Sequence, residues 1–280
     1  MSSVNGRWDI TVNGEYPSWV DLNGAESRFV GRVGSARAVE TVEVIDNFVR
    51  WQLPRQYESR DADLAFEGRL EGDVLSGTTV GEDGEEVTWS ATRAPELPYY
   101  EPTWGDKFSL IGDGDLSNWH LRSPDWESHW RVADGMLYNE KVGSDLISNH
   151  AFQDFKLVAE YKYPAGSNSG IYLRGRYEFQ IVDDHGHAPG LGTSGAVYGF
   201  LAPSENAVNP ADEWNTAEIT LIGRFVSIVL NGKRVIDKQE IPGITGGALD
   251  CNEGAPGTLF LQGDHGPVVF RRLDLTVATK

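Results

Sequence analysis

The sequence predicts an all-β protein of two domains. Its 280 residues exceed the usual length of one domain, although a single large β-sandwich remains the alternative. Thirty-two glycines, thirteen prolines and thirty aromatic residues are typical of short strands joined by tight turns. No segment longer than about two helical turns has the apolar spacing of an amphipathic helix.

Charge and cysteine content exclude several classes of function. The formal net charge of −18 and the pI of about 4.7 disfavour binding to nucleic-acid phosphates and to anionic membrane surfaces. Cys251 is the only cysteine, so neither an internal disulfide nor a cysteine-based zinc cage can form. We find no glycine pattern of a nucleotide-binding loop and therefore expect no cofactor.

The first residues contain no basic segment followed by an apolar run, and no stretch of about 18 apolar residues occurs. We therefore expect neither a signal peptide nor a membrane span. This predicts a cytoplasmic protein, or a periplasmic or secreted one whose export signal has been removed.

Residues 1–93 are expected to form a small all-β accessory domain. Turn residues separate eight short strands, which suits an up-and-down barrel or a small sandwich. Gly6-Arg-Trp8 and the hairpin at Phe66–Gly77 resemble the barrels of lipocalins and avidins. No histidine occurs before His120, and the carboxylates lie on turns, so we expect no catalysis here. The strands are expected to begin at Gly6 and then to span Trp19–Leu22, Ser27–Val33, Ala38–Ile45, Phe48–Leu53, Asp63–Leu70, Val74–Val80 and Glu86–Thr92.

Residues 94–104 contain three prolines and no alternation, which predicts an extended linker. The second domain is therefore expected to span 105–280. Asp134-Gly135 and Asn231-Gly232 are strong signals for two-residue β-hairpin turns. The strands predicted in this domain are Trp130–Ala133, Met136–Asn139, Asp145–Ser148, Phe155–Tyr163, Glu218–Gly223, Phe225–Leu230, Arg234–Asp237, Gly257–Gln262 and Val268–Val277.

The densest group of polar side chains lies in Asn168–Asp184. Two alternating runs, Gly170–Arg174 and Tyr177–Asp183, predict a hairpin with one apolar and one polar face. Amide, aromatic and charged groups together suit the binding of a sugar. The alternative is a solvated face with a cross-strand pair between Arg174 and Glu178. The polar face is predicted to carry Asn168, Tyr172, Arg174, Glu178 and Gln180.

Two segments have spacings that resemble metal sites, and we predict a metal at neither. Asp113-Gly-Asp115 lacks the remaining ligands of a calcium loop and is expected to be a surface turn. In Asp183-Asp-His185 and the nearby His187, neighbouring side chains alternate in direction and cannot all converge. The glycines and the proline that follow favour a flexible rim.

Ten short motifs occur in order between residues 105 and 278: Leu116-Ser-Asn-Trp119, Trp130-Arg-Val-Ala-Asp-Gly135, Asn168-Ser-Gly-Ile-Tyr-Leu-Arg-Gly175, Tyr177-Glu-Phe-Gln-Ile-Val-Asp183, Gly195-Ala-Val-Tyr-Gly199, Glu213-Trp-Asn215, Leu230-Asn-Gly232, Leu261-Gln262, His265-Gly266 and Phe270-Arg271. This region resembles the 3-keto-disaccharide hydrolase domain family. The resemblance implies a concanavalin-like jelly-roll β-sandwich related to family 16 glycoside hydrolases. The first hundred residues also resemble an extra β domain that some members carry.

The resemblance implies action on glycosides whose glucose carries a ketone at C3. Such a ketone acidifies the C2 hydrogen, so a base can remove it, the C1 substituent can leave, and water can add back. This route needs a base and a group that stabilises the enolate oxygen. Direct hydrolysis would instead need two carboxylates about 5–10 Å apart. We expect Glu178 to be the base and Arg174 to stabilise the enolate.

Other residues complete the predicted site. His265, in a turn between the last two strands, is expected to act as an acid or base and to reach the same face as Glu178. Asp183 is a further catalytic candidate. The predicted substrate-binding residues are Asn168, Tyr172, Gln180, Tyr198, Trp214 and Gln262.

A glycosidase acting on 3-keto-glycosides is the first prediction, and a non-catalytic carbohydrate-binding module on the same sandwich is the second. A protein-interaction sandwich is the third possibility, and no apolar patch supports it. The expected ligand is a 3-keto-glycoside or another carbohydrate. A separate sugar 3-oxidoreductase would have to supply a 3-keto substrate.

Overall fold

The computed structural model describes residues 3–279 except 32, 33, 35, 40, 56–62, 82 and 113. The chain divides into two compact units. Unit 1 comprises Met1–Glu96 and Gly243–Gly254, and unit 2 comprises Leu97–Pro242 and Ala255–Lys280. In the described part of the chain the one helical element is a 3₁₀ turn, η1 (Gly24–Glu26), and no helix there has the length and apolarity to cross a membrane.

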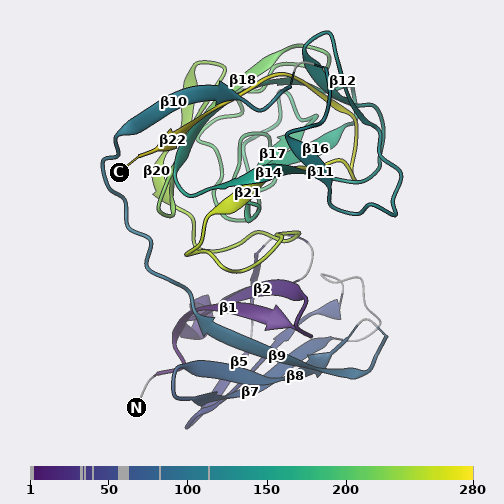
Figure 1. The fold of residues 1–280 in the computed structure, drawn as a ribbon. Helices are drawn as coiled ribbons and strands as arrows, with labels where there is room; N and C mark the ends of the chain where they lie inside the picture. Colours follow the sequence, from purple (N-terminus) through teal and green to yellow (C-terminus); the bar gives the residue numbers. More distant parts are fainter. Residues whose placement is uncertain are drawn as a thin grey trace. The chain divides into compact units, whose positions relative to one another are not determined.

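Unit 1 is an antiparallel meander of nine strands, drawn from purple to blue in Figure 1. The sheet order is β4-β3-β2-β1-β9-β8-β7-β6-β5, so the first and last strands of the meander pair with each other. The sequence left open an up-and-down barrel or a small sandwich, and this meander with β1 paired to β9 is the barrel. The strands are β1 (Gly6–Val12), β2 (Tyr16–Leu22), β3 (Arg28–Val30), β4 (Arg37–Ala38), β5 (Val42–Ile45), β6 (Phe48–Leu53), β7 (Leu64–Glu71), β8 (Val74–Val80) and β9 (Glu86–Arg93).

The core of unit 1 is formed by every second residue of these strands. In β7, Leu64, Phe66 and Leu70 are buried, whereas the residues that alternate with them are more exposed. Four rings pack together at the centre of the barrel, with Trp51 and Phe66 stacked at 5.1 Å between centroids. Such contacts add about 0.5–1.5 kcal/mol per pair to the burial of area. The four rings are those of Phe29, Trp51, Phe66 and Trp89.

Unit 2 is a β-sandwich of the jelly-roll type, with two sheets layered over each other in Figure 1. The larger sheet has the order β12-β13-β22-β15-β18-β19-β20, with β10 also paired to β22. Its strands are β10 (Trp104–Ser109), β12 (Trp130–Ala133), β13 (Met136–Asn139), β15 (Phe155–Lys162), β18 (Asn215–Ile222), β19 (Phe225–Leu230), β20 (Lys233–Glu240) and β22 (Val268–Ala278).

The smaller sheet has five strands in the order β11-β14-β21-β16-β17. Phe179 of this sheet packs edge-on against Tyr161 of the larger one, with ring centroids 6.2 Å apart, so the shared core lies between the sheets. Its strands are β11 (Trp119–Leu121), β14 (Leu146–Phe152), β16 (Asn168–Leu173), β17 (Tyr177–Val182) and β21 (Gly257–Leu261).

Most predicted strands are present, and the differences have local causes. β10 and β11 lie in segments that are rich in turn residues, and the sequence did not predict them. The predicted strand Ala38–Ile45 is divided into β4 and β5, with Glu40 outside the described residues. The predicted strand Ser27–Val33 ends as β3 at Val30, and Arg32 and Val33 also lie outside the described residues.

Candidate active site

The register of β16 and β17 decides which side chains share a face. Tyr172 pairs with Glu178, and Gly170 pairs with Gln180. Paired residues of antiparallel strands point to the same side, so these four positions lie together, opposite the buried core face of Phe179. β21 adds Phe260, which pairs with Tyr172. We call this side of the smaller sheet the polar face.

Glu178 is the central group of the polar face. Its side chain is buried, and the Tyr172 hydroxyl donates a hydrogen bond to Oε2 at 3.0 Å. Burial raises the pKa of Glu178 to about 8, while the Tyr172 hydrogen bond and the positive charge of His265 act in the opposite direction. The carboxyl therefore exchanges a proton near neutral pH and can serve as a base.

Gly170 provides the space that the Glu178 carboxyl occupies. A Cβ at this position would lie 2.6 Å from Glu178 Oε1, closer than real Cβ contacts allow. The absence of a side chain on one strand thus lets the carboxyl of the next strand lie across it.

Tyr172 is held by an aromatic partner. Its ring stacks on Phe260 with 4.3 Å between centroids and an interplanar angle of 16°, and the Arg122 guanidinium lies 5.0 Å from the Phe260 ring. Burial and the neighbouring Glu178 raise the pKa of Tyr172 well above its usual value, so it remains a hydrogen-bond donor at neutral pH.

Asp145 links the polar face to the turn that carries His265. Its Oδ1 accepts hydrogen bonds from the backbone N–H groups of Gly263 at 2.8 Å and Asp264 at 3.2 Å, and its Oδ2 lies 3.3 Å from Nη1 of Arg122. Burial, followed by the negative charge of Asp264, raises the pKa of Asp145, while the Gly263 hydrogen bond and Arg122 lower it. One buried carboxyl therefore fixes the turn Gly263–His265.

His265 is half-exposed and hydrogen-bonded through Nδ1 to the Asp264 carboxylate. That hydrogen bond raises the pKa of His265, with burial opposing it and the negative charge of Glu178 adding to the increase. The imidazolium form therefore persists to higher pH than in a free histidine. The charges of His265 and Glu178 act on each other: His265 lowers the pKa of Glu178, and Glu178 raises the pKa of His265.

Three amides supply acceptor atoms. On the part of the chain that the structure describes, the side-chain oxygens of Asn168, Gln180 and Gln262 are buried without a hydrogen-bond partner. The Gln180 amide nitrogen donates to the Gly192 carbonyl at 3.4 Å. Buried polar atoms are normally satisfied, so unfilled acceptors on one face suit a ligand rich in hydroxyl groups. Tyr198 is brought to the edge of β17, where its N–H donates to the Glu178 carbonyl at 2.9 Å.

Arg174 does not share the polar face, and this part of the sequence prediction is wrong. β16 ends at Leu173, and Arg174 occupies the hairpin turn with φ of 54°. Its buried guanidinium donates to the Gly223 carbonyl and lies 5.2 Å from the Tyr177 ring. The left-handed backbone of the turn thus directs the Arg174 side chain toward Gly223 and Tyr177.

Two further candidates also lie away from Glu178. Trp214 is placed among groups of the larger sheet, with Arg271 at 4.3 Å and Lys162 at 5.2 Å from its ring. Asp183 accepts a hydrogen bond from the Gly166 N–H at 2.8 Å and so closes the loop before β16. Trp214 therefore does not lie with Glu178 on the polar face, and Asp183 stabilises a local turn.

The groups that follow Asp183 are each bound to a different loop. Asp184 Oδ2 accepts from the Ser194 N–H at 3.0 Å, and His185 Nδ1 lies 2.7 Å from the Val208 carbonyl. Within the described ranges no group of three or more histidine, cysteine or acidic residues could hold a metal ion. Asp113 of the calcium-like turn lies outside the described residues, and Asp115 accepts from the Ser117 N–H at 2.9 Å.

Sequence reasoning missed Asp145, Arg122 and Phe260. Phe260 could have been found, because it alternates with Gln262 along a predicted strand and must share its face. Asp145 and Arg122 carry no comparable signal, since Gly263, which Asp145 binds, and Phe260, which Arg122 contacts, lie more than a hundred residues away in the sequence.

Comparison with known proteins identifies the second unit. Residues 106–276 match the family model described as the 3-keto-alpha-glucoside-1,2-lyase-like domain. A curated relative is the 3-keto-disaccharide hydrolase of Bacteroides thetaiotaomicron, 26% identical over 173 residues, which are 49% of this chain and 60% of the relative. The match thus spans only about three fifths of that protein.

Solved structures agree with the fold. A "putative glycosyl hydrolase" from Parabacteroides distasonis is 25% identical, with a TM-score of 0.51 over 64% of this chain and 93% of its own. A second from the same organism, 20% identical over 60% of this chain and 92% of its own, has a TM-score of 0.50 and supports the fold. The ordered motifs, the jelly roll and the family match together show that the chain belongs to the 3-keto-alpha-glucoside-1,2-lyase-like domain family.

Proposed function

We propose that the protein cleaves 3-keto-glycosides by removing the C2 proton, expelling the C1 substituent and then adding water. The observation that carries this proposal is Glu178, a buried carboxyl whose pKa is raised to about 8 on a face that carries unsatisfied amide acceptors. A base for C2 needs a pKa near the working pH, and burial supplies it here. The family description and the relative's name support the same substrate class.

In the proposed step the Glu178 carboxylate takes the C2 proton, and charge develops on the C3 ketone oxygen. The C1–C2 double bond then forms as the C1–O bond breaks. The His265 imidazolium gives its proton to the departing oxygen, which leaves as an alcohol. Water adds to C1 and a proton to C2 of the unsaturated 3-keto sugar, so the net result is hydrolysis.

The remaining groups have binding and electrostatic roles in this proposal. Arg122, rather than Arg174, supplies positive charge for the enolate, because Arg174 is engaged in the hairpin turn. The oxygens of the three amides accept hydrogen bonds from sugar hydroxyls. The stacked Tyr172–Phe260 pair provides an aromatic surface beside them. A separate oxidoreductase must make the ketone.

The test uses a 3-keto-disaccharide and its ordinary disaccharide, with products followed by mass spectrometry. We expect release of sugar from the keto substrate alone, with a transient 1,2-unsaturated product that direct hydrolysis would not form. Glu178→Gln should reduce turnover by about 100-fold or more. Glu218→Gln, on an exposed position of β18, is the matched control and should keep wild-type turnover. Full activity in Glu178→Gln would remove the assigned base.

Carbohydrate binding without turnover is the second candidate, and the three buried amide oxygens favour it. It predicts that the wild-type protein binds an intact glycoside with a Kd of about 1 μM to 1 mM and releases nothing. Calorimetric titration alongside the product assay separates the two functions.

A further inference from the structure

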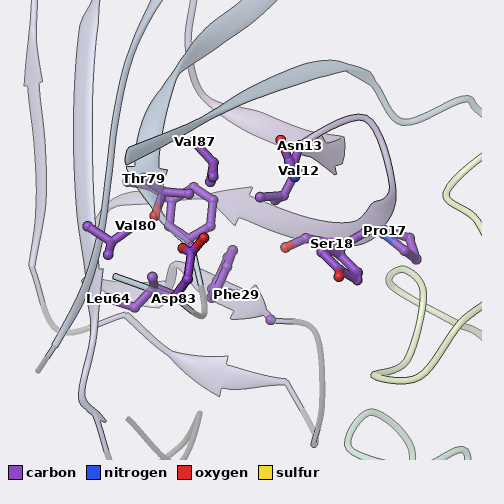
Figure 2. A pocket seen from close by; sticks show the side chains of 14 residues that line it. Val12, Asn13, Pro17, Ser18, Phe29, Leu64, Thr79, Val80, Asp83 and Val87 are labelled. Carbon is purple, nitrogen blue, oxygen red and sulfur yellow. The ribbon is translucent and has the colours of Figure 1, made fainter. Parts of the chain in front are cut away.

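Unit 1 contains a cavity of about 300 Å³ that the proposed reaction does not use. Its wall is formed by residues from β1, β2, β3, β7, β8 and β9, so it lies inside one end of the barrel. Figure 2 shows Val12 and Val87 on one side of this space and Leu64 and Phe29 on the other. The volume is at the lower end of the range for small-molecule sites.

The base of the cavity is rigid and aromatic. Phe29 and Phe66 line it, and their rings lie 4.9 Å apart at 58°. Both rings also pack against Trp51, and both side chains are almost fully buried. These rings support the wall from behind, and the partly exposed apolar lining includes Val12, Pro17 and Val87. A preformed apolar wall favours a rigid ligand, because little conformational entropy is lost on binding.

The buried polar atoms of the cavity act only as acceptors. The Ser18 hydroxyl donates to the Val30 carbonyl at 2.5 Å, and the Thr79 hydroxyl donates to the Ala65 carbonyl at 2.7 Å. Each hydroxyl has one proton, which is therefore already used, and only its oxygen lone pairs remain. Ser18 and Thr79 lie on opposite sides of the cavity in Figure 2. A ligand that satisfies either must bring an O–H or N–H donor.

The charge at the cavity disfavours anions. Asp83 lines it, and its carboxylate accepts a hydrogen bond from the Glu85 N–H at 3.0 Å. The cavity lining that the structure describes contains no lysine, arginine or histidine. A carboxylate or phosphate placed here would meet the like charge of Asp83.

We propose that unit 1 binds an uncharged aromatic alcohol in this cavity, with its ring against Val12, Pro17 and Val87 and its hydroxyl donating to Thr79 or Ser18. The site is separate from the polar face of unit 2, and the proposal does not depend on the function proposed for that face.

The test uses three matched probes and the full chain: 2-naphthol, 2-methoxynaphthalene and 2-naphthoate. Their rings are alike, but only 2-naphthol is both uncharged and a donor. Calorimetric titration should show binding of 2-naphthol and about tenfold weaker binding of the methyl ether, which has lost the donor. The carboxylate should not bind measurably. Equal binding of the three probes, or no binding of 2-naphthol, overturns the proposal.

Variants locate the site. Val87→Phe places a ring in the cavity and should abolish 2-naphthol binding, and Val12→Phe should do the same from β1. Val74→Phe, at an exposed position of β8, is the matched control and should bind like wild type. Thermal unfolding identifies any variant that fails to fold. If one of the two cavity variants does not fold, binding to the other decides whether the cavity is the site. Binding that persists in folded Val87→Phe or Val12→Phe contradicts the assignment. Glu178→Gln should bind 2-naphthol normally even if turnover is lost.

Discussion

Glu178 and Tyr172 show how one hydrogen bond can set the pH range of a buried carboxyl, here the proposed base. Burial disfavours the ionised carboxylate, and the Tyr172 hydroxyl stabilises it, so the pKa settles at about 8. Below that pH most Glu178 is protonated and could not act as the proposed base. In the proposed reaction His265 must instead keep its proton, and the hydrogen bond to Asp264 favours this by raising the pKa of His265 above 6.5.

Tyr172→Phe should move the acidic limb of the kcat/KM profile to higher pH by about one unit. The variant loses the donor that stabilises the Glu178 carboxylate, and a hydrogen bond to a charged group is worth about 1.5–3 kcal/mol. The measurement is kcat/KM for a 3-keto-disaccharide between pH 5 and about 10. Tyr163→Phe is the control, because its hydroxyl donates to the Asn209 carbonyl instead. An unshifted limb would show that Tyr172 acts only through packing.

The same carboxyl should make stability depend on pH. Between the ordinary pKa of 4.5 and about 8 the folded state holds the Glu178 proton more tightly than the unfolded state does, so stability falls as pH rises. The contribution is about 1.4 kcal/mol per pH unit at most. Glu178→Gln removes this pH-dependent contribution. The free energy of unfolding of the variant minus that of wild type should therefore be larger at pH 8 than at pH 4.5. Denaturant unfolding at both pH values measures this, and an equal difference at both would refute it.

At the scale of elements, the β16–β17 hairpin positions Glu178, the proposed base. Gly170 leaves room for the carboxyl, and backbone hydrogen bonds from Tyr198 and to Ala196 hold the outer edge of β17. Glu178 is thus carried by a strand that is bonded on both sides, which restricts its position more than a loop would.

Gly170→Ala should lower turnover by about tenfold or more while the fold persists. The new Cβ would lie 2.6 Å from Glu178 Oε1, so the carboxyl must move away from Tyr172. Steady-state kinetics and thermal unfolding together test this. Gly190→Ala is the control, since its nearest neighbour would be an ordinary contact at 3.9 Å. Wild-type kinetics in Gly170→Ala would mean that the carboxyl is not held by this close approach.

Elements whose turns are encoded locally could be predicted from sequence. Asn231-Gly232 and Asp134-Gly135 adopt left-handed φ values at both positions and join β19 to β20 and β12 to β13, which confirms both hairpins. The hairpin between β16 and β17 was predicted, but the first strand was expected to end at Arg174. It ends at Leu173, so the turn begins one residue earlier than predicted. The Gly223 carbonyl that binds Arg174 belongs to another strand connection, and no local pattern encodes it.

At the scale of the whole molecule, the net charge of −18 predicts a salt-dependent stability. Self-repulsion among carboxylates destabilises the compact state, and salt screens it, with a Debye length of about 30 Å at 10 mM and about 10 Å at 100 mM. Raising NaCl over this range should increase the free energy of unfolding by about 1 kcal/mol, which corresponds to a rise in Tm of about 2–4 °C. Calorimetry at fixed pH measures this, and a fall in Tm would show that attractive ion pairs dominate.

The all-β class, the strong hairpins and the polar alternation of Tyr172, Glu178 and Gln180 could be predicted from the amino-acid sequence, because a strand's two faces follow from neighbouring residues. Which distant groups meet these side chains depends on the three-dimensional fold. Asp145 reaches the turn at Gly263–His265, and Arg122 reaches Phe260, through the order and register of strands. Trp214 lies with groups of the other sheet for the same reason. Side-chain alternation is local, whereas sheet order depends on packing the whole core.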